Sequence, residues 1–184
     1  SAWATDAPVV LNAYWRDFTH TPGRKPQIVA LPSTTEEVQA VIRIAREFSL
    51  PIVPMSTGFN HGGCCIPRRG GILVDLKRMN AVCRIDREAM TLTVSPYVNH
   101  AVAYEECRKV ELYPGITLRP ANAITLGGVS ILSNHISGGV SHMVYKAGRH
   151  HENIVSMTWI LPDGSILKTG PGSYLDSSLP AAHG

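Results

Sequence analysis

Apolar residues recur at helical spacing along residues 38–48, ahead of a short run at 50–54 in which nearly every position is apolar. This spacing places them on one face and predicts a helix that packs on a core. Ser33 with Glu36 fits a capping box at its start, and Thr34 with Glu37 fits one equally well. The apolar positions are Val38, Val41, Ile42, Ala45 and Phe48.

Short apolar runs separated by turn residues predict strands in the rest of the chain. We expect them at residues 50–54, 71–76, 82–86, 91–95, 153–161 and 166–169, with a second helix over 99–110. Residues 1–30 and 171–184 carry no clear pattern, and we expect the first to be irregular and the second to be an unstructured tail. Because helices and strands are mixed without regular alternation, the pattern predicts an α+β fold rather than a doubly wound sheet.

The composition narrows the class of protein. The 184 residues carry a net charge of +3, and charged residues make up only 17% of the chain. The basic residues form no dense stripe, which argues against a nucleic-acid partner. No run approaches the roughly 18 apolar residues that span a membrane, so we expect no membrane partner. The four cysteines do not have the spacing of a disulfide framework, which indicates a reducing compartment and a cytoplasmic protein.

Two glycine-rich segments are candidate phosphate sites. Residues 56–63 follow a predicted strand, and consecutive amides in such a loop can form an anion-binding nest. Residues 125–134 place Gly127-Gly128 ahead of a predicted helix start, where amides also favour an anion. The alternatives are an ordinary turn for the first segment and a small-residue helix packed on a sheet for the second. Neither segment has the pattern of a Walker loop or of a dinucleotide-binding fingerprint.

Metal binding is a weaker hypothesis. His61, Cys64 and Cys65 lie close together, but a zinc site needs about four ligands at workable spacing. His150-His151 would have to come from a distant part of the chain to complete the set. The sequence therefore predicts no metal site, and a metal-binding module is the last of the alternatives.

The order of several motifs resembles the FAD-binding domain of the vanillyl-alcohol oxidase and para-cresol methylhydroxylase family. The resemblance covers residues 24–172, with residues 1–23 as an N-terminal extension and 173–184 as a tail. The matching pieces are Pro32–Val38, Pro51–Asn60, Gly71–Leu76, Met79-Asn80, Leu126–Gly128 with Asn134, Glu152–Met157, Leu161–Gly164 and Lys168–Gly170.

The resemblance implies a two-subdomain α+β fold that holds an extended FAD. It implies that the 56–62 loop and the 127–130 turn wrap the diphosphate through backbone amides, that Ile154 lies along the adenine or ribose, and that Gly148 and His150 belong to a late family loop. The implied cofactor-binding residues are Ser56, Thr57, Gly58, Phe59, Asn60, His61, Gly62, Thr125, Gly127, Gly128, Ser130, Asn134, Gly148, His150 and Ile154.

Three departures from the family concern the chemistry of the site. His61 lies near the place of a substrate-contacting tyrosine of the phenol-oxidising members, and Thr125 stands where some members carry an aspartate. These two residues are the candidates for a catalytic role, although a threonine cannot act as the same acid or base. Phe59 holds the place of a histidine that binds flavin covalently in some relatives, so we expect no covalent attachment through this domain.

The family also has a substrate-binding cap domain, which this chain lacks together with the late segment of the FAD domain. The resemblance therefore implies either a fragment or a subunit completed by a partner chain, inactive by itself, with a homodimer as one possible assembly.

The implied function is the FAD-binding part of an oxidoreductase that takes hydride from the alcohol carbon of a small-molecule substrate to flavin N5. The substrate would be a phenolic or benzylic alcohol or a 2-hydroxy acid. The alternative is a non-catalytic module that binds a flavin or nucleotide, or another protein.

Overall fold

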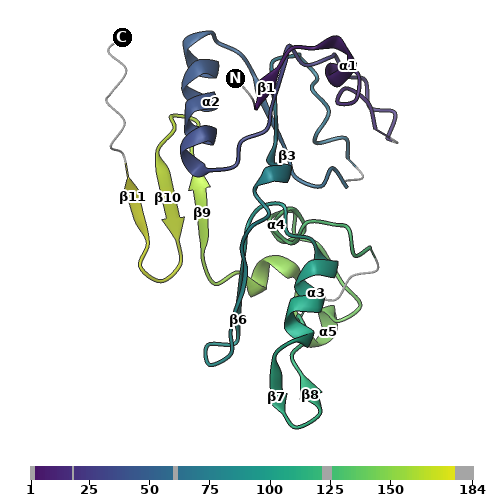
Figure 1. Cartoon of the computed structure of the whole chain (residues 1–184), viewed down its shortest axis with the longest axis vertical. Coiled ribbons are helices and arrows are strands. Elements are labelled where there is room, and N and C mark those ends of the chain that lie inside the picture. The colour runs from purple at the N-terminus through teal and green to yellow at the C-terminus, as the bar shows by residue number, and fades with distance from the viewer. Residues whose placement is uncertain (1–2, 18, 60–61, 122–125, 177–184) are drawn as a thin grey trace. The chain divides into compact units, whose positions relative to one another are not determined.

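The computed structural model describes residues 3–17, 19–59, 62–121 and 126–176. These residues form two compact units, shown as a ribbon in Figure 1. Unit 1 contains residues up to 55, residues 62–75 and residues from 155 onward. Unit 2 contains residues 56–59 and 76–154. The chain therefore passes between the units four times, and the short segment 56–59 belongs to unit 2 although unit 1 precedes and follows it.

A four-stranded sheet with the strand order β1-β2-β4-β3 forms the centre of unit 1. Strands β2, β4 and β3 are parallel, and β1 adds to the edge in the antiparallel direction. All four residues of β4 are buried: its three apolar residues as expected in the middle of a parallel sheet, and Asp75 as an acceptor of the Tyr14 hydroxyl at 2.8 Å. The strands are β1 Ala4–Thr5, β2 Ile28–Ala30, β3 Ile52–Met55 and β4 Ile72–Asp75, and a short helix, α1 Pro8–Leu11, follows β1.

Helix α2, Thr35–Glu47, confirms the helix predicted from the apolar spacing. Its N-cap is Thr34, whose hydroxyl accepts the backbone N–H of Glu37 at 3.2 Å. The Glu37 carboxylate reaches back to the backbone N–H of Ser33 at 2.6 Å. The second of the two proposed caps is therefore the correct one. The helix buries Val41, Ile42 and Ala45 as predicted. The prediction is wrong for Phe48, which lies just after the helix as its C-cap and is exposed.

The expectation of an unstructured tail is wrong for its first part. Strands β9 Met157–Ile160 and β10 Ile166–Thr169 form the predicted hairpin, and β11 Tyr174–Asp176 adds to it as a third antiparallel strand. The reversal between β10 and β11 contains Gly170 at φ +93° and Gly172 at φ +69°, values that only glycine adopts readily. A strand of three residues carries too few positions to show an alternating pattern.

The irregular N-terminus is also a correction, because β1, α1 and β2 all lie within residues 1–30. Strand β2 is short and lies between Pro26 and Pro32, which hid it among apparent loop residues. Its backbone pairs with β4 on one side and with β1 on the other. Val29 and Ala30 are consequently part of the core.

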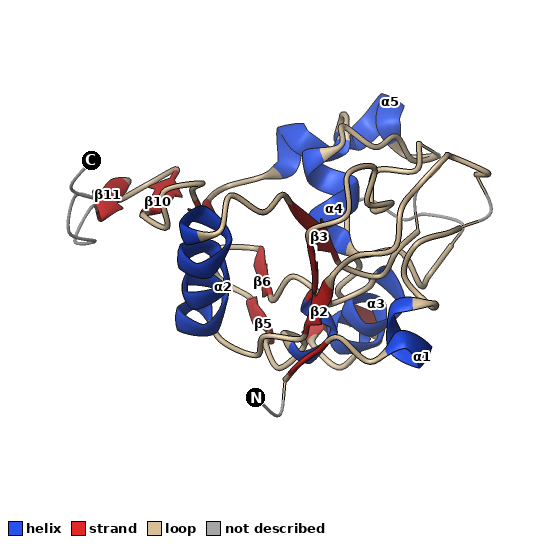
Figure 2. Cartoon of the chain, turned by 90° about the horizontal axis from the view of Figure 1, so that it is seen from above, coloured by secondary structure: helices blue, strands red, loops and turns tan. Residues whose placement is uncertain are grey.

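Unit 2 combines two hairpins with short helices around a small core of Val98, Ala103 and Ile131. The predicted hairpin at 82–95 and the predicted helix at 99–110 are both present. Figure 2 shows the helices and strands in different colours. The elements are η1 Leu76–Arg78, β5 Cys83–Asp86, β6 Thr91–Val94, α3 His100–Arg108, β7 Glu111–Tyr113, β8 Ile116–Thr117, α4 Ile131–Ile136, α5 Val144–Ala147 and η2 His150–Asn153.

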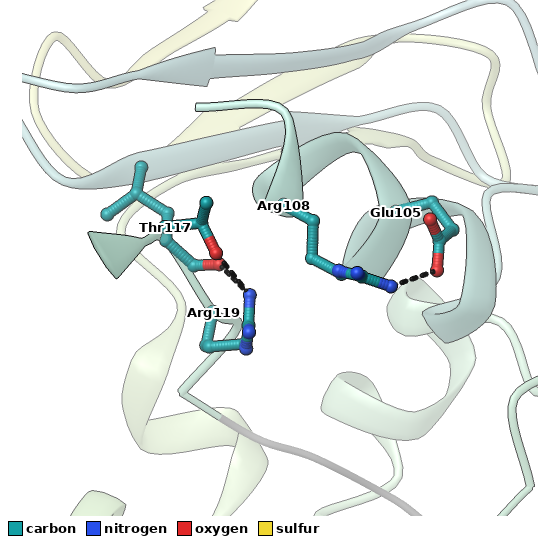
Figure 3. A network of polar contacts seen from close by, with 5 residues as sticks. Glu105, Arg108, Thr117 and Arg119 are labelled. Carbon is teal, nitrogen blue, oxygen red and sulfur yellow. Dashed lines mark hydrogen bonds and ion pairs between the residues drawn. The ribbon is translucent and has the colours of Figure 1, made fainter. Parts of the chain in front are cut away.

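Polar side chains of α3 and β8 lie on the surface of unit 2 (Figure 3). Arg108 forms an ion pair with Glu105 at 3.5 Å, and both side chains are more than half exposed. Arg119 donates to the hydroxyl of Thr117 and lies over the ring of Tyr104. Exposed contacts of this kind add little to stability.

The mixture of helices, a partly parallel sheet and antiparallel hairpins confirms the predicted α+β class. Among the described residues, no helix is long and apolar enough to cross a membrane.

Candidate functional site

The two glycine-rich segments meet in unit 2, at the carbonyl oxygen of Pro96. The hydroxyl of Ser56 donates to this oxygen at 2.7 Å, and the hydroxyl of Ser130 donates to it at 2.9 Å. Both serines are buried, with Ser130 fully inaccessible. A carbonyl oxygen has two lone pairs, so Pro96 is saturated by these two contacts. The segments that the sequence could only treat separately therefore share one anchor.

A direct hydrogen bond also joins the segments. The backbone N–H of Ser130 donates to the hydroxyl oxygen of Thr57 at 3.0 Å. In this contact the Thr57 oxygen is the acceptor, so its own O–H remains a donor. We call this arrangement, residues 56–59 and 126–131 with Pro96, the junction.

Most of the amides in the second segment already have acceptors within the protein. The N–H of Ile131 donates to Val98 at 3.0 Å, and the N–H of Ser133 donates to the hydroxyl of Ser130 at 3.2 Å. The predicted helix start at Ser130 is confirmed, with Ser130 as the N-cap of α4. Its engaged amides reduce the number that could receive an anion, leaving the glycine turn before the helix as the better candidate.

Backbone shape and close neighbours favour glycine at the three glycine positions of the junction. Gly58 has φ +75°, in the left-handed region that favours glycine. A Cβ on Gly128 would lie 3.3 Å from the ring of Phe59, and a Cβ on Gly127 would lie 3.1 Å from the Cβ of Ala101. The outer surface here is open, because Phe59 and Gly128 are exposed.

The late loop that contains Gly148 forms a tight turn before η2. Gly148 has φ +74°, and a Cβ there would lie 2.2 Å from a carboxylate oxygen of Glu152. That carboxylate accepts the backbone N–H of Arg149 at 2.8 Å. Ile154 follows the turn directly and is half-buried. Gly148 is thus held by the fold itself, and its contact with a ligand stays a prediction, as does that of Ile154.

Asn134 packs against the backbone of another glycine. Its backbone carbonyl accepts the N–H of Gly139 at 2.9 Å, and a Cβ on Gly139 would collide with its side chain. The carbonyl of Gly139 in turn accepts the N–H of His150 at 3.0 Å. Asn134 therefore helps to position His150 through one intervening residue.

Three histidines from separate elements lie together inside unit 2. His100 begins α3, His135 lies in α4 and His150 begins η2. Their ring centroids are 6.1, 5.9 and 5.0 Å apart, and one nitrogen from each ring lies within 4.8 Å of the other two. We call this group the histidine cluster. The sequence predicted His150 as a residue of the late, cofactor-binding loop and as a distant complement to His61 and the cysteines, and gave no indication of His100 or His135.

The environment of the histidine cluster favours the neutral form of its three imidazoles. Burial is the main cause that lowers the pKa of His100 to about 4, and the other two imidazoles add to it. Burial also lowers the pKa of His135 and that of His150. Neutral imidazoles keep a nitrogen lone pair available at neutral pH.

Some predicted site residues lie outside the described residues: Asn60, His61 and Thr125, which include both catalytic candidates. Gly62 is described and belongs to unit 1, whereas Ser56–Phe59 belong to unit 2. Pro96 was not identified from the sequence, since a backbone carbonyl has no residue-type signal. The histidines carried such a signal, but only the fold shows which of the eight in the chain come together.

Comparisons with known proteins agree with the resemblance. Residues 26–170 match the family described as "FAD binding domain". The chain is 32% identical over 163 residues to D-lactate dehydrogenase [cytochrome] 1, mitochondrial, of Saccharomyces cerevisiae, covering 86% of this chain and 26% of the yeast protein. It is 30% identical over 155 residues to the 4-cresol dehydrogenase [hydroxylating] flavoprotein subunit of Pseudomonas putida, covering 83% of this chain and 29% of that one.

A solved structure gives the same answer for the fold. The 4-ethylphenol oxidase from Gulosibacter chungangensis superposes with a TM-score of 0.77 at 30% identity, over 94% of this chain and 34% of that chain. The chain thus spans about a quarter to a third of the length of the relatives that it matches.

Proposed function

The chain belongs to the family of FAD-binding domains, with FAD as the cofactor, and on that premise we propose that the junction holds the FAD diphosphate. The observation that carries the proposal is the hydrogen-bonded meeting of residues 56–59 with residues 126–131 at Pro96. The two glycine-rich segments, each a candidate phosphate site by itself, would then act as one site.

The chemistry of the junction suits a diphosphate. Neither segment contains a carboxylate that would repel it. Thr57 offers a hydroxyl hydrogen, and the glycines at 58, 127 and 128 let a charged group approach the backbone closely. Because Ser56 and Ser130 donate their hydroxyl hydrogens to Pro96, their role would be to fix the two segments rather than to touch the ligand. The contacts of Asn60, His61, Gly62, Thr125, Asn134, Gly148, His150 and Ile154 with FAD remain predictions.

For the whole protein we propose an oxidoreductase that removes hydride from an alcohol carbon. When bound, FAD would supply the two-electron oxidation of the alcohol carbon, with flavin N5 as the hydride acceptor and a base as the acceptor of the hydroxyl proton. The relatives' names include a D-lactate dehydrogenase and a 4-cresol dehydrogenase, which supports 2-hydroxy acids and phenolic or benzylic substrates as the two classes. This chain would position the cofactor, and His61 and Thr125 are the residues proposed to lie near the reacting atoms.

The substrate-binding part of the site would come from protein beyond this chain. The relatives are about three to four times as long as the matched region, and one of them is named as a flavoprotein subunit. A further domain or a partner chain would thus supply substrate contacts. A homodimer is one form that such an assembly can take.

The binding proposal is tested by titrating the flavin-free protein with FAD and following flavin fluorescence. We expect Gly128→Val to weaken FAD binding by at least roughly tenfold, because the added side chain occupies the path to the backbone. Gly115→Ala is the matched control. Gly115 has φ +76° with nothing within 4 Å of an added Cβ, so this variant strains a turn away from the junction. Equal affinity in Gly128→Val and the unchanged protein would contradict the proposal.

The catalytic proposal is tested by anaerobic mixing of the FAD-loaded full-length protein with D-lactate, glycolate or 4-hydroxybenzyl alcohol. Loss of the oxidised flavin absorbance with one class identifies the substrate class. Absence of reduction by every 2-hydroxy acid and phenol tried, in a protein that binds FAD, would favour the non-catalytic module instead. Acid precipitation of the same sample should release the flavin into the supernatant, since Phe59 stands where a covalent histidine is found in relatives.

A further inference from the structure

The histidine cluster has the geometry of a nearly formed metal site. One nitrogen of each ring lies within 4.8 Å of the other two, and the three residues come from α3, α4 and η2. In a tetrahedral zinc site with Zn–N distances of about 2.0–2.1 Å, ligand nitrogens lie about 3.4 Å apart. Small rotations of the rings would therefore bring the three nitrogens to coordinating distance.

Unpartnered nitrogens in the cluster point to something that the protein chain does not supply. The Nε2 of His100 and both ring nitrogens of His150 are buried and find no hydrogen-bond partner among the described residues. His150 is completely inaccessible, and His100 is 6% exposed. Buried polar atoms are normally hydrogen-bonded or bound to an ion, because leaving them unpaired is costly.

The third ring is oriented as ligand histidines usually are. The Nδ1 of His135 lies 2.8 Å from the carbonyl oxygen of Ile131, one turn earlier in α4. With the proton on Nδ1, this contact leaves the lone pair on Nε2. A histidine that binds a metal typically donates its other N–H to a backbone carbonyl or a carboxylate in this way.

The backbone around the cluster is fixed as well. The N–H of His100 donates to Val129 at 3.0 Å, and the N–H of His150 donates to Gly139 at 3.0 Å. Gly139 is in turn bonded to Asn134, next to His135 in sequence. Each histidine is thus anchored by a hydrogen bond from its own backbone or ring, which favours a pre-formed site over a chance meeting of side chains.

We propose that His100, His135 and His150 together bind one first-row transition-metal ion, with Zn²⁺ as the reference ion. Three imidazoles suit Zn²⁺, Co²⁺, Ni²⁺ or copper, and do not suit Mg²⁺ or Ca²⁺, which prefer oxygen ligands. A fourth position would remain for water or a small anion. The metal site does not rest on the proposal for the junction, because none of its three ligands is a junction residue. It is an alternative to the predicted contact of His150 with FAD.

The test is metal titration of the untagged, chelator-treated full chain, with Zn²⁺ followed by calorimetry and Co²⁺ by its visible absorption. We expect one ion per chain. The Co²⁺ form should show the intense visible bands of four-coordinate geometry, at wavelengths longer than those of flavin absorption. His135→Asn is the key variant, since the Asn amide can still donate to the Ile131 carbonyl while the coordinating nitrogen is lost. It should weaken Zn²⁺ binding by more than roughly 100-fold, beyond the effect of losing an outer contact.

His142→Gln is the matched control, because His142 is an exposed histidine between α4 and α5 and is not part of the cluster. Its Zn²⁺ affinity should equal that of the unchanged protein. The circular dichroism spectrum of His135→Asn, measured without metal, should match as well, which separates loss of a ligand from loss of the fold. Binding of less than one ion per chain, or equal weakening by His135→Asn and His142→Gln, would overturn the proposal.

Discussion

The junction and the histidine cluster both bury polar groups in unit 2, and they do so in opposite ways. Around Pro96 the two buried serine hydroxyls have partners at 2.7 and 2.9 Å. In the histidine cluster three buried ring nitrogens have no partner among the described residues. The junction is complete within the protein and serves to hold two segments together. The cluster is incomplete, and this difference is why it suggests an absent ion whereas buried Ser130 does not.

Among variants measured without metal, the largest loss of stability is expected from Ser130→Ala, which removes a hydrogen bond of the junction. The variant removes a donor to Pro96 and the N-cap acceptor for Ser133 from a fully buried position. We expect the free energy of unfolding to fall by about 2 kcal/mol, measured by urea denaturation of metal-free protein. Ser137→Ala, at an exposed position after α4, is the control and should change it little. Equal losses of unfolding free energy in the two variants would mean that the hydrogen bonds of Ser130 do not stabilise the junction.

Thr57→Val should have a smaller effect on stability, and its effect on FAD affinity gives a second measurement. The change keeps the shape of the side chain but leaves the N–H of Ser130 without its acceptor. We expect a loss of about 1 kcal/mol in unfolding free energy and a weaker FAD affinity. Thr93→Val, at an exposed position of β6, is the comparison. A normal FAD affinity in Thr57→Val would separate the segment's structural role from ligand binding.

His100→Leu tests the histidine cluster. Its effect on the unfolding free energy should differ between metal-free protein and protein with Zn²⁺. In the presence of a chelator, replacing an unpartnered buried imidazole by an apolar group should leave the unfolding free energy within about 1 kcal/mol or raise it. In the unchanged protein, Zn²⁺ at 100 times its dissociation constant should add about 2.7 kcal/mol. His100→Leu should lose this gain. A large loss of stability without metal would mean that the imidazole has a partner in solution.

Arg108→Ala should have the smallest effect and sets the baseline. Its ion pair with Glu105 is exposed on both sides, so its removal should cost less than about 0.5 kcal/mol. Thermal unfolding at low and at high salt checks this, with little difference expected between the variant and the unchanged protein. A larger effect would mean that surface contacts, too, contribute to the stability of unit 2.

Local patterns predicted those elements whose signal lies in their own residues. Helix α2 shows its buried face in residues one turn apart, and β4 shows three consecutive apolar residues before Asp75, so both were identified from the sequence. Strands β1, β2 and β11 have two or three residues each and exist because a neighbouring strand pairs with them. Two or three residues are too few to show a pattern of their own, whether the partner is distant, as β4 is from β2, or adjacent, as β10 is to β11.

In the candidate site, too, the sequence predicted the features with a local signal and missed those that depend on contacts between distant residues. The glycines at 58, 127 and 128 marked the two segments of the junction, and the family resemblance related them to a diphosphate. Their connection through Pro96 could not be predicted, because every residue has a backbone carbonyl. The histidine cluster was missed for a different reason. His100 precedes His135 by thirty-five residues and His150 follows by fifteen, and no known spacing links such positions.

The position of residues 56–59 has a consequence for the order of events during synthesis. When Ser56 is added to the growing chain, Pro96 is still forty residues from being made, and Ser130 follows much later. Unit 1 waits longer still, because Gln39 of α2 bonds to Gly164 at 2.7 Å and β9 to β11 arrive last. Neither unit can close while only the first half of the chain exists. We therefore expect slow, late folding that starts after most of the chain has emerged, and a nascent chain that depends on protection from aggregation until then.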